Sequence, residues 1–189
     1  MTRIIAGEFG GRTLAVPARG TRPTTDRVRE AVFSRLEHLG VLPDAVALDL
    51  FAGSGALGLE AVSRGAARVT LVESAAGAVA TLRKNVAALK VGDRARVARS
   101  AVLTYLKAAG DDVDLVFLDP PYDLADEDML EVLTALVPHL KPEAYVVVEW
   151  PSRRDVPWPA QLRPEAAKTY GETAIHYVAL ASKEGSVEP

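Results

Sequence analysis

The stretch VFLDPPYD, residues 116–123, runs an apolar strand directly into a carboxylate, two prolines and a tyrosine. Proline has no N–H and locks its own φ, and the residue before a proline is pushed out of the helical region towards extended geometry. Asp119 and Pro120 each precede a proline, so both are held in extended conformations. The carbonyls of this turn cannot readily pair within a helix or a strand ladder. We expect the Asp119 carboxylate and the Pro120 carbonyl to be rigid acceptors, with the ring of Tyr122 beside them, for a ligand that carries N–H donors.

A glycine-rich stretch, DLFAGSGALGLE, ends the first strand of the central part of the chain. Gly53, Gly55 and Gly58 satisfy the pattern G-x-G-x-x-G, and Glu73 ends the next strand, 20 residues after Gly53. This spacing is typical of a turn that binds a nucleotide, with the acid on the ribose hydroxyls. Dehydrogenases and S-adenosylmethionine enzymes share it, and a tight strand-to-helix turn without a ligand is a further alternative.

Asp49 separates these two enzyme classes. A carboxylate inside the first strand, four residues before the glycine turn, would repel a pyrophosphate but could hold water or the ammonium of a methionine. We therefore expect S-adenosylmethionine as the cofactor. The residues predicted to bind it at the ends of the first two strands are Asp49, Phe51, Ala52, Gly53, Ser54, Gly55, Glu73 and Ser74.

The elements that must position these residues follow from the hydrophobic pattern. The short apolar strands VALDLF, RVTLVE, ARVARS, DLVFLD and AYVVVEW alternate with alanine-rich stretches that are typical of helices. The alternation predicts an α/β fold, with a doubly wound, mostly parallel, Rossmann-like sheet covered on both faces. A strand around residues 168–170, then Gly171 and TAIHYVALA, predicts a hairpin, so we expect the sheet to finish with an antiparallel strand.

The amino-terminal part lies outside this alternation. RIIA and TLAV flank a turn with three glycines at residues 7–12, which predicts a β-hairpin. RPTTDRVREAVFSRLEHLG then predicts an amphipathic helix, with Thr24 or Thr25 as its cap, Asp26 at its positive end and Gly40 as its stop.

Composition limits the organisation of the chain. With 189 residues, 49% of them apolar, the chain has room for one well-buried domain and a small appendage. We expect a hairpin extension over residues 1–22, a main domain over 23–183 and a frayed tail over 184–189. The sequence has no cysteine and only three scattered histidines, so we expect no metal site. A chain without cysteine suits the reducing cytoplasm, so we expect a cytoplasmic location. The sequence gives no sign of a dimer, so we expect a monomer. No run approaches the roughly 18 apolar residues of a membrane span.

Charge is distributed unevenly. The net charge is −3, but residues 1–35 hold seven arginines and three acidic residues, a balance of +4 that leaves −7 for the rest. An arginine-rich segment on an acidic body could track phosphates, because each guanidinium offers a planar fork of donors. A solvated surface would explain the charge equally well. The candidate contacts to nucleic acid are Arg3, Arg12, Arg22 and Arg27, with Arg153 and Arg154 after the fifth strand.

In combination, D-L-F-A-G-S-G, an acid ending the second strand and D-P-P-Y ending the fourth resemble the class I S-adenosylmethionine-dependent methyltransferases that act on exocyclic amines. More narrowly, R-I-I-A-G-E-F-G-G-R, R-P-T-T-D-R-V-R-E-A-V-F, the glycine loop, D-P-P-Y and T-Y-G-E-T, in this order, are similar to the RsmD-like family. That family methylates N2 of one guanine in small-subunit (16S) ribosomal RNA. The resemblance covers nearly the entire chain.

The resemblance implies small-subunit ribosomal RNA as the partner, either naked or within an assembled 30S-type particle. It also implies that Ser100 and Ala101, which end the third strand, meet the adenine of the cofactor. Here the chain departs from the family, which usually has an aspartate at the position of Ser100. Adenine recognition would then be weaker or would pass to the backbone at Ala101.

The resemblance gives the D-P-P-Y turn a chemical role. A guanine exocyclic amine is a double donor whose lone pair is conjugated with the ring. The Pro120 carbonyl and the Asp119 carboxylate could accept its two N–H bonds and hold the nitrogen in line with the methyl group. Pro121 would keep the turn rigid, and Tyr122 would offer a face to a base taken out of its stack. The sulfonium departs as a neutral thioether, and the methylated amine then loses its extra proton easily, so no strong general base is needed.

Three other functions are weighed against this one. A DNA adenine methyltransferase would use the same chemistry, but the sheet needs both the 70-residue gap from Asp49 to Asp119 and the 67 residues after Tyr122, which leaves no target-recognition domain. Methyltransferases of glutamine side chains carry asparagine where this chain has Asp119. A ribosomal RNA-binding or assembly module with a vestigial pocket would show no heat on titration with S-adenosylmethionine.

Overall fold

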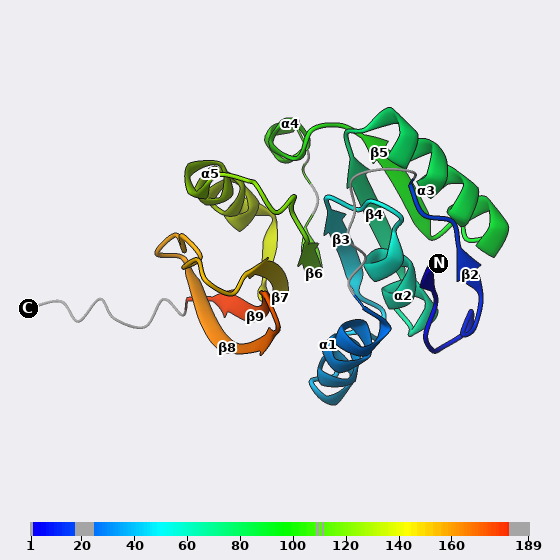
Figure 1. Ribbon diagram of the computed structural model, residues 1–189, viewed down its shortest axis with the longest axis horizontal. Helices are drawn as coiled ribbons and strands as arrows, with labels where there is room; N and C mark the ends of the chain where they lie inside the picture. Colours follow the sequence, from blue (N-terminus) through cyan, green and yellow to red (C-terminus); the bar gives the residue numbers. More distant parts are fainter. Residues whose placement is uncertain (1, 18–24, 109, 111, 182–189) are drawn as a thin grey trace, which may run out of the picture.

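The computed structural model describes residues 2–17, 25–108, 110 and 112–181. Seven strands form one sheet in the order β5-β4-β3-β6-β7-β9-β8 (Figure 1). The strands are β3 Val46–Leu50, β4 Arg68–Glu73, β5 Ala95–Arg99, β6 Val113–Leu118, β7 Leu140–Pro151, β8 Leu162–Tyr170 and β9 Thr173–Leu180. The first five strands, β3 to β7, are parallel to one another, whereas β9 is antiparallel to both β7 and β8. The predicted doubly wound sheet with an antiparallel carboxyl-terminal strand is therefore confirmed, with β9 lying inside the sheet and β8 at its edge.

Helices cover both faces of the sheet. The helices are α1 Asp26–His38, α2 Ala56–Ser63, α3 Ala76–Leu89, α4 Val102–Ala108 and α5 Asp126–Leu136, followed by a 3-10 turn, Val137–His139. Apolar side chains of α1, α2 and α3 form one buried cluster with alternate strand residues such as Leu71 and Phe117. Those of α4 and α5 form a second cluster with Val116 and Val148 on the opposite face.

The first helix begins and ends as the sequence predicts. The Thr25 hydroxyl accepts a hydrogen bond from the backbone N–H of Val28 at 3.3 Å, and Asp26 occupies the first turn, where the helix dipole favours a negative charge. Gly40 follows the helix with a φ of +67°, a conformation that glycine adopts at little cost. Thr24, the alternative cap, lies outside the described residues.

The predicted amino-terminal hairpin is confirmed in a shorter form, with β1 Thr2–Arg3 paired to β2 Thr13–Leu14. Its side chains Ile4, Phe9 and Leu14 belong to the main core. A Cβ on Gly7 would lie 1.9 Å from the carbonyl oxygen of Ser63, so only glycine lets the turn of the hairpin rest on the end of α2. The hairpin is thus packed onto the main domain.

Two buried charges tie the hairpin to the helices beneath it. Arg29 of α1, which is 0% exposed, donates to the Thr2 hydroxyl at 2.7 Å and to the Arg3 carbonyl at 2.6 Å. Glu60 of α2, also 0% exposed, accepts the backbone N–H groups of Ile5 at 2.7 Å and Ala6 at 3.0 Å. Burial of these charges is compensated because each makes several hydrogen bonds.

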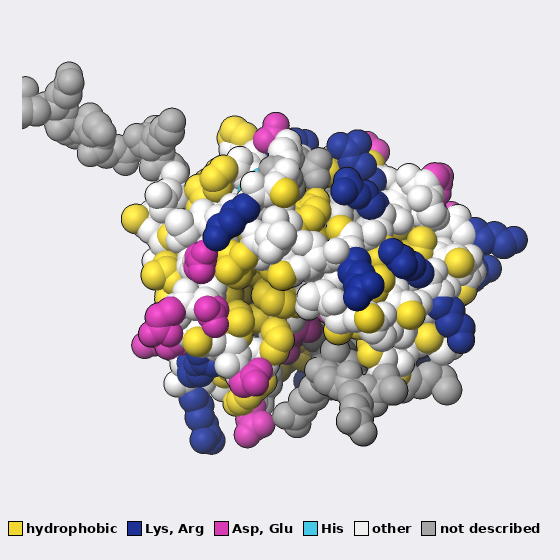
Figure 2. All heavy atoms as spheres, turned by 90° about the horizontal axis from the view of Figure 1, so that it is seen from above, with side chains coloured by type: hydrophobic (Ala, Val, Ile, Leu, Met, Phe, Trp, Pro, Cys, Tyr) yellow, Lys and Arg dark blue, Asp and Glu magenta, His cyan; other side chains and the backbone are white. Residues whose placement is uncertain are grey.

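Figure 2 shows one face of the molecule from above, with acidic side chains gathered on its left and basic ones on its right. The left side holds α5, whose first turn is acidic, and the right side holds α3 and β5. Among the described residues, no helix is long and apolar enough to cross a membrane. The same residues contain no group of three or more His, Asp or Glu that could hold a metal ion.

Candidate active site

The ends of three parallel strands bring the predicted site residues to one edge of the sheet. Leu50 of β3 pairs in register with Val72 of β4 and with Leu118 of β6. The next residues along these strands are Phe51, Glu73 and Asp119. Neighbouring strands lie about 4.8 Å apart, so the glycine turn, the acid and the D-P-P-Y turn start side by side. They meet at the carboxyl ends of parallel strands, which is where open α/β sheets bind ligands.

The glycine turn is tight and conformationally constrained. Phe51, Gly53 and Gly55 have φ values of +65°, +55° and +80°, and the N–H of Gly55 donates to the Ala52 carbonyl at 2.7 Å. A Cβ on Gly55 would lie 2.7 Å from a methyl group of Leu82 on α3. Phe51 is not a glycine, and a left-handed conformation at such a residue is strain of the kind that gathers at functional sites.

Glu73 organises the glycine turn. Its carboxylate accepts the N–H of Gly53 at 3.0 Å on one oxygen and the N–H of Ala75 at 2.8 Å on the other. A carboxylate has about four lone-pair positions, so two remain after these bonds. The side chain is partly exposed at the end of β4. It can therefore hold the turn and still accept the two hydroxyls of a ribose, which fits the nucleoside part of S-adenosylmethionine.

Asp49 lies beneath the turn rather than in it. It is 1% exposed, and its carboxylate accepts the N–H of Gly58 in α2 at 2.9 Å. A Cβ on Gly58 would come within 3.0 Å of the same oxygen and 2.5 Å of Leu71, so the third glycine allows α2 to pack on the strands. Burial raises the pKa of Asp49 to about 7; the Gly58 N–H opposes the shift, and the charge of Glu73 adds to it.

The end of β5 lies next to Glu73 at the same edge. The N–H of Ser100 donates to the Glu73 carbonyl at 3.1 Å, and the Ser100 hydroxyl donates to the Ala101 carbonyl at 3.0 Å. Ser74 and Ala101 are exposed, and Ser100 is partly exposed. The edge thus presents the backbone of residues 100–101 beside the acid, where the adenine of a nucleoside held by Glu73 would reach it.

The D-P-P-Y turn leaves the buried strand β6 abruptly. Leu118 is 1% exposed, Asp119 and Pro120 are partly buried, and Tyr122 is 65% exposed. The N–H of Leu124 closes the turn on the Pro121 carbonyl at 3.0 Å. Within the described residues the Pro120 carbonyl accepts no hydrogen bond. It can therefore serve as an acceptor for a substrate amine, next to an aromatic face.

Arg154 holds this turn in place, although the sequence suggested a contact to nucleic acid. Its guanidinium donates to the carbonyls of Tyr122 at 3.3 Å and Leu124 at 2.8 Å and pairs with Asp126. It also lies 4.4 Å from the centre of the Trp150 ring. Because a guanidinium carries five donors in a planar fork, one side chain can fix both carbonyls of the turn and the start of α5.

Asn85 of α3 is a residue that the sequence did not single out. It is 3% exposed, exchanges two hydrogen bonds with the backbone of Ala15 at 2.8 and 2.9 Å, and donates to the Ser54 carbonyl at 2.9 Å. The hairpin is thereby connected to the glycine turn. An asparagine inside an apolar helical stretch was the available signal, since a buried amide must find partners.

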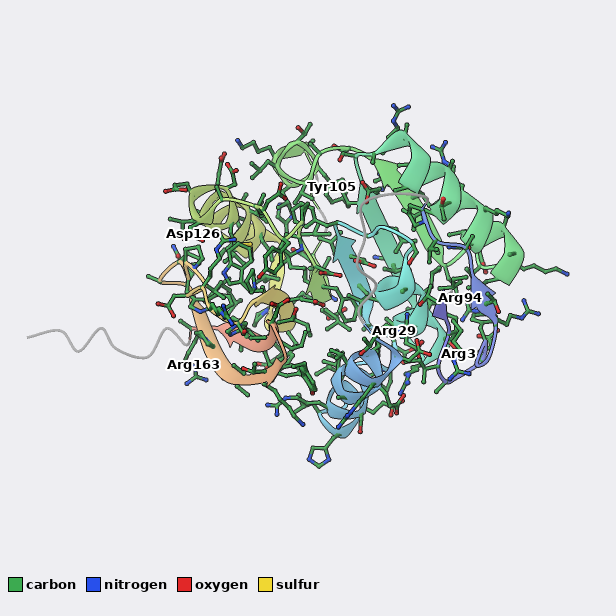
Figure 3. The ribbon with its side chains drawn as sticks, in the orientation of Figure 1. Arg3, Arg29, Arg94, Tyr105, Asp126 and Arg163 are labelled. Carbon is green, nitrogen blue, oxygen red and sulfur yellow. The ribbon has the colours of Figure 1, made fainter. Side chains whose placement is uncertain are left out.

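The remaining candidates for nucleic-acid contact have different surroundings. Arg3 pairs with Asp26 at 3.0 Å, and Figure 3 shows it close to Arg29. Arg12 donates to the Ala88 carbonyl at 3.2 Å and remains exposed. Two further candidates, Arg27 and Arg153, are exposed and form no ion pair within the described residues; Arg22 lies outside those residues.

Comparison with known proteins gives consistent matches. The chain matches the family model "Conserved hypothetical protein 95" over residues 2–179. "Ribosomal RNA small subunit methyltransferase D" of Escherichia coli K12 is 51% identical over 121 residues, which cover 64% of this chain and 60% of that protein. The alignment thus spans less than two thirds of that relative. The protein of the same name from Haemophilus influenzae is 40% identical over 151 residues, 78% of this chain and 77% of the relative.

The fold has a counterpart among solved structures. The structure of the Escherichia coli protein named "Putative methyltransferase yhhF" is similar with a TM-score of 0.84 and 41% sequence identity. The match covers 96% of this chain and 99% of that one. The sheet, the hairpin and the site edge described above therefore lie within a shared architecture.

Proposed function

Because the chain belongs to the RsmD-like family, we propose that it is an S-adenosylmethionine-dependent methyltransferase that modifies N2 of a guanine in small-subunit ribosomal RNA. One observation carries the proposal. The pairing of Leu50 with Leu118 sets the glycine turn and the D-P-P-Y turn next to each other, so a methyl donor and an amine acceptor would meet there.

The strand ends would hold the cofactor, whose sulfonium supplies an electrophilic methyl group. Glu73 would accept the ribose hydroxyls, while the backbone of residues 51–55 would follow the methionine part. Residues 100–101 would receive the adenine. Asp49 is buried, so it would act on the methionine ammonium through water or through the turn that it supports.

The D-P-P-Y turn would hold the target amine. Asp119 and Pro120 would accept its two N–H groups and orient the nitrogen towards the methyl group, which supplies most of the catalysis by positioning and electrostatic stabilisation. The exposed ring of Tyr122 would stack on the extruded guanine. Arg154 would act through the turn as a positioning residue.

The partner in this proposal is ribosomal RNA in the cytoplasm, either naked or within a 30S-type particle, and the protein acts as a monomer. Among the arginines considered from the sequence, Arg12, Arg27 and Arg153 are exposed and available for phosphates.

Two measurements test the proposal. Calorimetric titration with S-adenosylmethionine should give a saturable heat, which a non-catalytic RNA-binding module would lack. Labelled cofactor should then transfer its methyl group to small-subunit ribosomal RNA or to 30S-type particles but not to double-stranded DNA. Transfer to DNA would instead favour the adenine methyltransferase, and cofactor binding without transfer to any of the three would contradict the proposed substrate.

A further inference from the structure

The most basic part of the chain is the segment between the cofactor acid and the end of α4. Residues 74–108 contain seven basic residues and one acidic residue, a balance of +6, compared with +4 for the equally long amino-terminal segment. The seven are Arg83, Lys84, Lys90, Arg94, Arg96, Arg99 and Lys107. The rest of the chain then carries −9. Charge segregation of this size on an acidic protein points to a polyanionic partner.

Three of these cations lie on or directly after α3. Arg83, Lys84 and Lys90 are exposed, and α3 contains no carboxylate. Arg83 and Lys90 are seven residues apart, two helical turns, and therefore lie along the same side of the helix axis. The other exposed residues of the helix are small, mainly alanines, so no side chain of α3 neutralises the charges.

Arg99 extends these charges to the candidate active site. It pairs in register with Glu73 across the β4–β5 ladder, and it is exposed at the end of the edge strand. We call the four cations Arg83, Lys84, Lys90 and Arg99 the α3–β5 surface. In Figure 2 basic side chains gather on the side of the molecule where α3 and β5 lie.

These four cations and the exposed Arg96 form no ion pair within the described residues, whereas two neighbouring basic residues do. Arg94 pairs with Glu8 at 2.8 Å, and Lys107 pairs with Glu131 at 2.9 Å. The amino-terminal segment is also partly neutralised, because Asp26 pairs with both Arg3 and the buried Arg29. The α3–β5 surface therefore retains more of its positive potential.

We propose that the α3–β5 surface binds the phosphate backbone of the substrate RNA along α3 and leads it to the site edge at Arg99. This inference rests on the proposed function and adds a docking surface to it. RNA fits better than an acidic protein, because protein interfaces need apolar and aromatic anchors, and α3 presents alanine between its cations. A row of cations without anchors suits phosphates, which are bound mainly through charge.

The test compares two double variants that remove the same charge. Arg83→Gln with Lys84→Gln acts on the α3–β5 surface. Arg163→Gln with Lys168→Gln removes one arginine and one lysine from exposed positions on β8, and Figure 3 places Arg163 on the opposite side of the molecule from Arg94. Glutamine keeps the length and polarity of the side chains, and titration with S-adenosylmethionine checks that each variant retains its site.

The readout is the affinity for a fluorescent small-subunit ribosomal RNA transcript at several salt concentrations, without cofactor. The α3 variant should bind about tenfold more weakly at low salt. Its slope of log affinity against log salt should fall by about 1.5, because each lost phosphate contact removes roughly 0.7 to 0.9. The β8 variant should match the wild type.

An α3 variant with wild-type affinity and slope would overturn the inference, as would an equal loss in the β8 variant. Methyl transfer by the wild type is assayed separately. Wild-type transfer to ribosomal RNA together with a silent α3 variant would remove the docking surface and leave the proposed function standing. Binding of the wild-type protein to anionic phosphatidylserine vesicles but not to RNA would also overturn the inference.

Discussion

One chemical group, the carboxylate, occupies three different environments at one sheet edge. Glu73 binds the glycine turn with one oxygen and the N–H of Ala75 with the other, Asp49 is buried beneath the turn, and Asp119 begins the turn after β6. Their positions at the sheet edge could be predicted because each carboxylate ends or interrupts an apolar strand. The bonds of Glu73 and Asp49 to backbone N–H groups could not, because they depend on how the turn folds back onto the strand ends.

At Asp119, the proposed chemistry predicts that a substitution lowers turnover without lowering the affinity for the cofactor. Asp119→Asn replaces a charged acceptor by an amide that can present its NH₂ group to the substrate amine. We expect methyl transfer to fall by roughly 10² or more, while the dissociation constant of S-adenosylmethionine changes only a few-fold. Calorimetry and single-turnover methylation measure the two effects. Equal losses in both would place Asp119 in the cofactor site instead.

At Asp49, the raised pKa predicts a pH-dependent stability. The native carboxyl binds its proton more tightly than the unfolded chain does, whose pKa is 3.8. The free energy of unfolding should therefore decrease as pH rises from about 4 to about 7, by as much as about 4 kcal/mol, and level off above.

Asp49→Asn removes this titration and keeps an oxygen for the Gly58 N–H. Urea unfolding of both proteins between pH 4.5 and 8 measures the effect: the variant should gain stability relative to the wild type as pH rises. A difference that stays constant with pH would show that Asp49 is not strained by its burial.

At the scale of elements, alternating strands and helices were predictable because buried strands and amphipathic helices have distinct periods. The length of β8 was not. Leu162–Tyr170 is exposed along most of its length as an edge strand, so its sequence, LRPEAAKTY, lacks the apolar alternation of a half-buried strand. The start of β7 was missed similarly, because Lys141, Pro142 and Glu143 precede its apolar run and are exposed or partly exposed.

Arg154 lies in the connection between β7 and β8 and links this connection to the turn after β6. Arg154→Ala should release the carbonyls of Tyr122 and Leu124 and lower kcat for methylation by about tenfold, with unchanged cofactor affinity. The exposed neighbour Arg153→Ala is the matched control and should leave kcat unchanged.

If Arg154 instead contacts RNA phosphates, a different result is expected. Arg154→Ala would then raise KM for RNA and reduce the salt dependence of RNA binding, with little effect on kcat. Arg154→Lys separates the two further, because lysine keeps the charge but cannot hold two carbonyls with one fork.

At the scale of the whole molecule, the amino-terminal hairpin is part of the domain core. Sequence reasoning placed it outside the repeating pattern, since it could not show that Glu60 accepts two N–H groups more than 50 residues earlier. The connection through Asn85 to Ser54 means that deleting the hairpin would also disturb the glycine turn. Among the described candidates for contact with phosphates, Arg12, Arg27, Arg153 and the four cations of the α3–β5 surface are exposed and form no ion pair.

Glu60→Ala tests this integration. Loss of the carboxylate leaves the N–H groups of Ile5 and Ala6 without their partner. It also removes the buried one of the three carboxylates that pair with the guanidinium of Arg64. We expect the free energy of unfolding to fall by about 3 to 5 kcal/mol and the melting temperature by roughly 10 °C. Glu131→Ala, which breaks only an exposed pair with Lys107, should change stability by less than about 1 kcal/mol. Similar losses in the two variants would contradict a buried tie.

The glycine turn and the D-P-P-Y turn are proposed to bring a methyl donor next to the exocyclic amine of a guanine in RNA, which receives the methyl group. Small-subunit ribosomal RNA lacking its own methyl groups is incubated with the protein and labelled S-adenosylmethionine, digested to nucleosides and separated by chromatography with mass detection. The label should appear in N2-methylguanosine and disappear with Asp119→Asn. Label in a methylated adenosine, or in a guanosine methylated on a ring nitrogen, would contradict the assignment of the D-P-P-Y turn to the guanine amine.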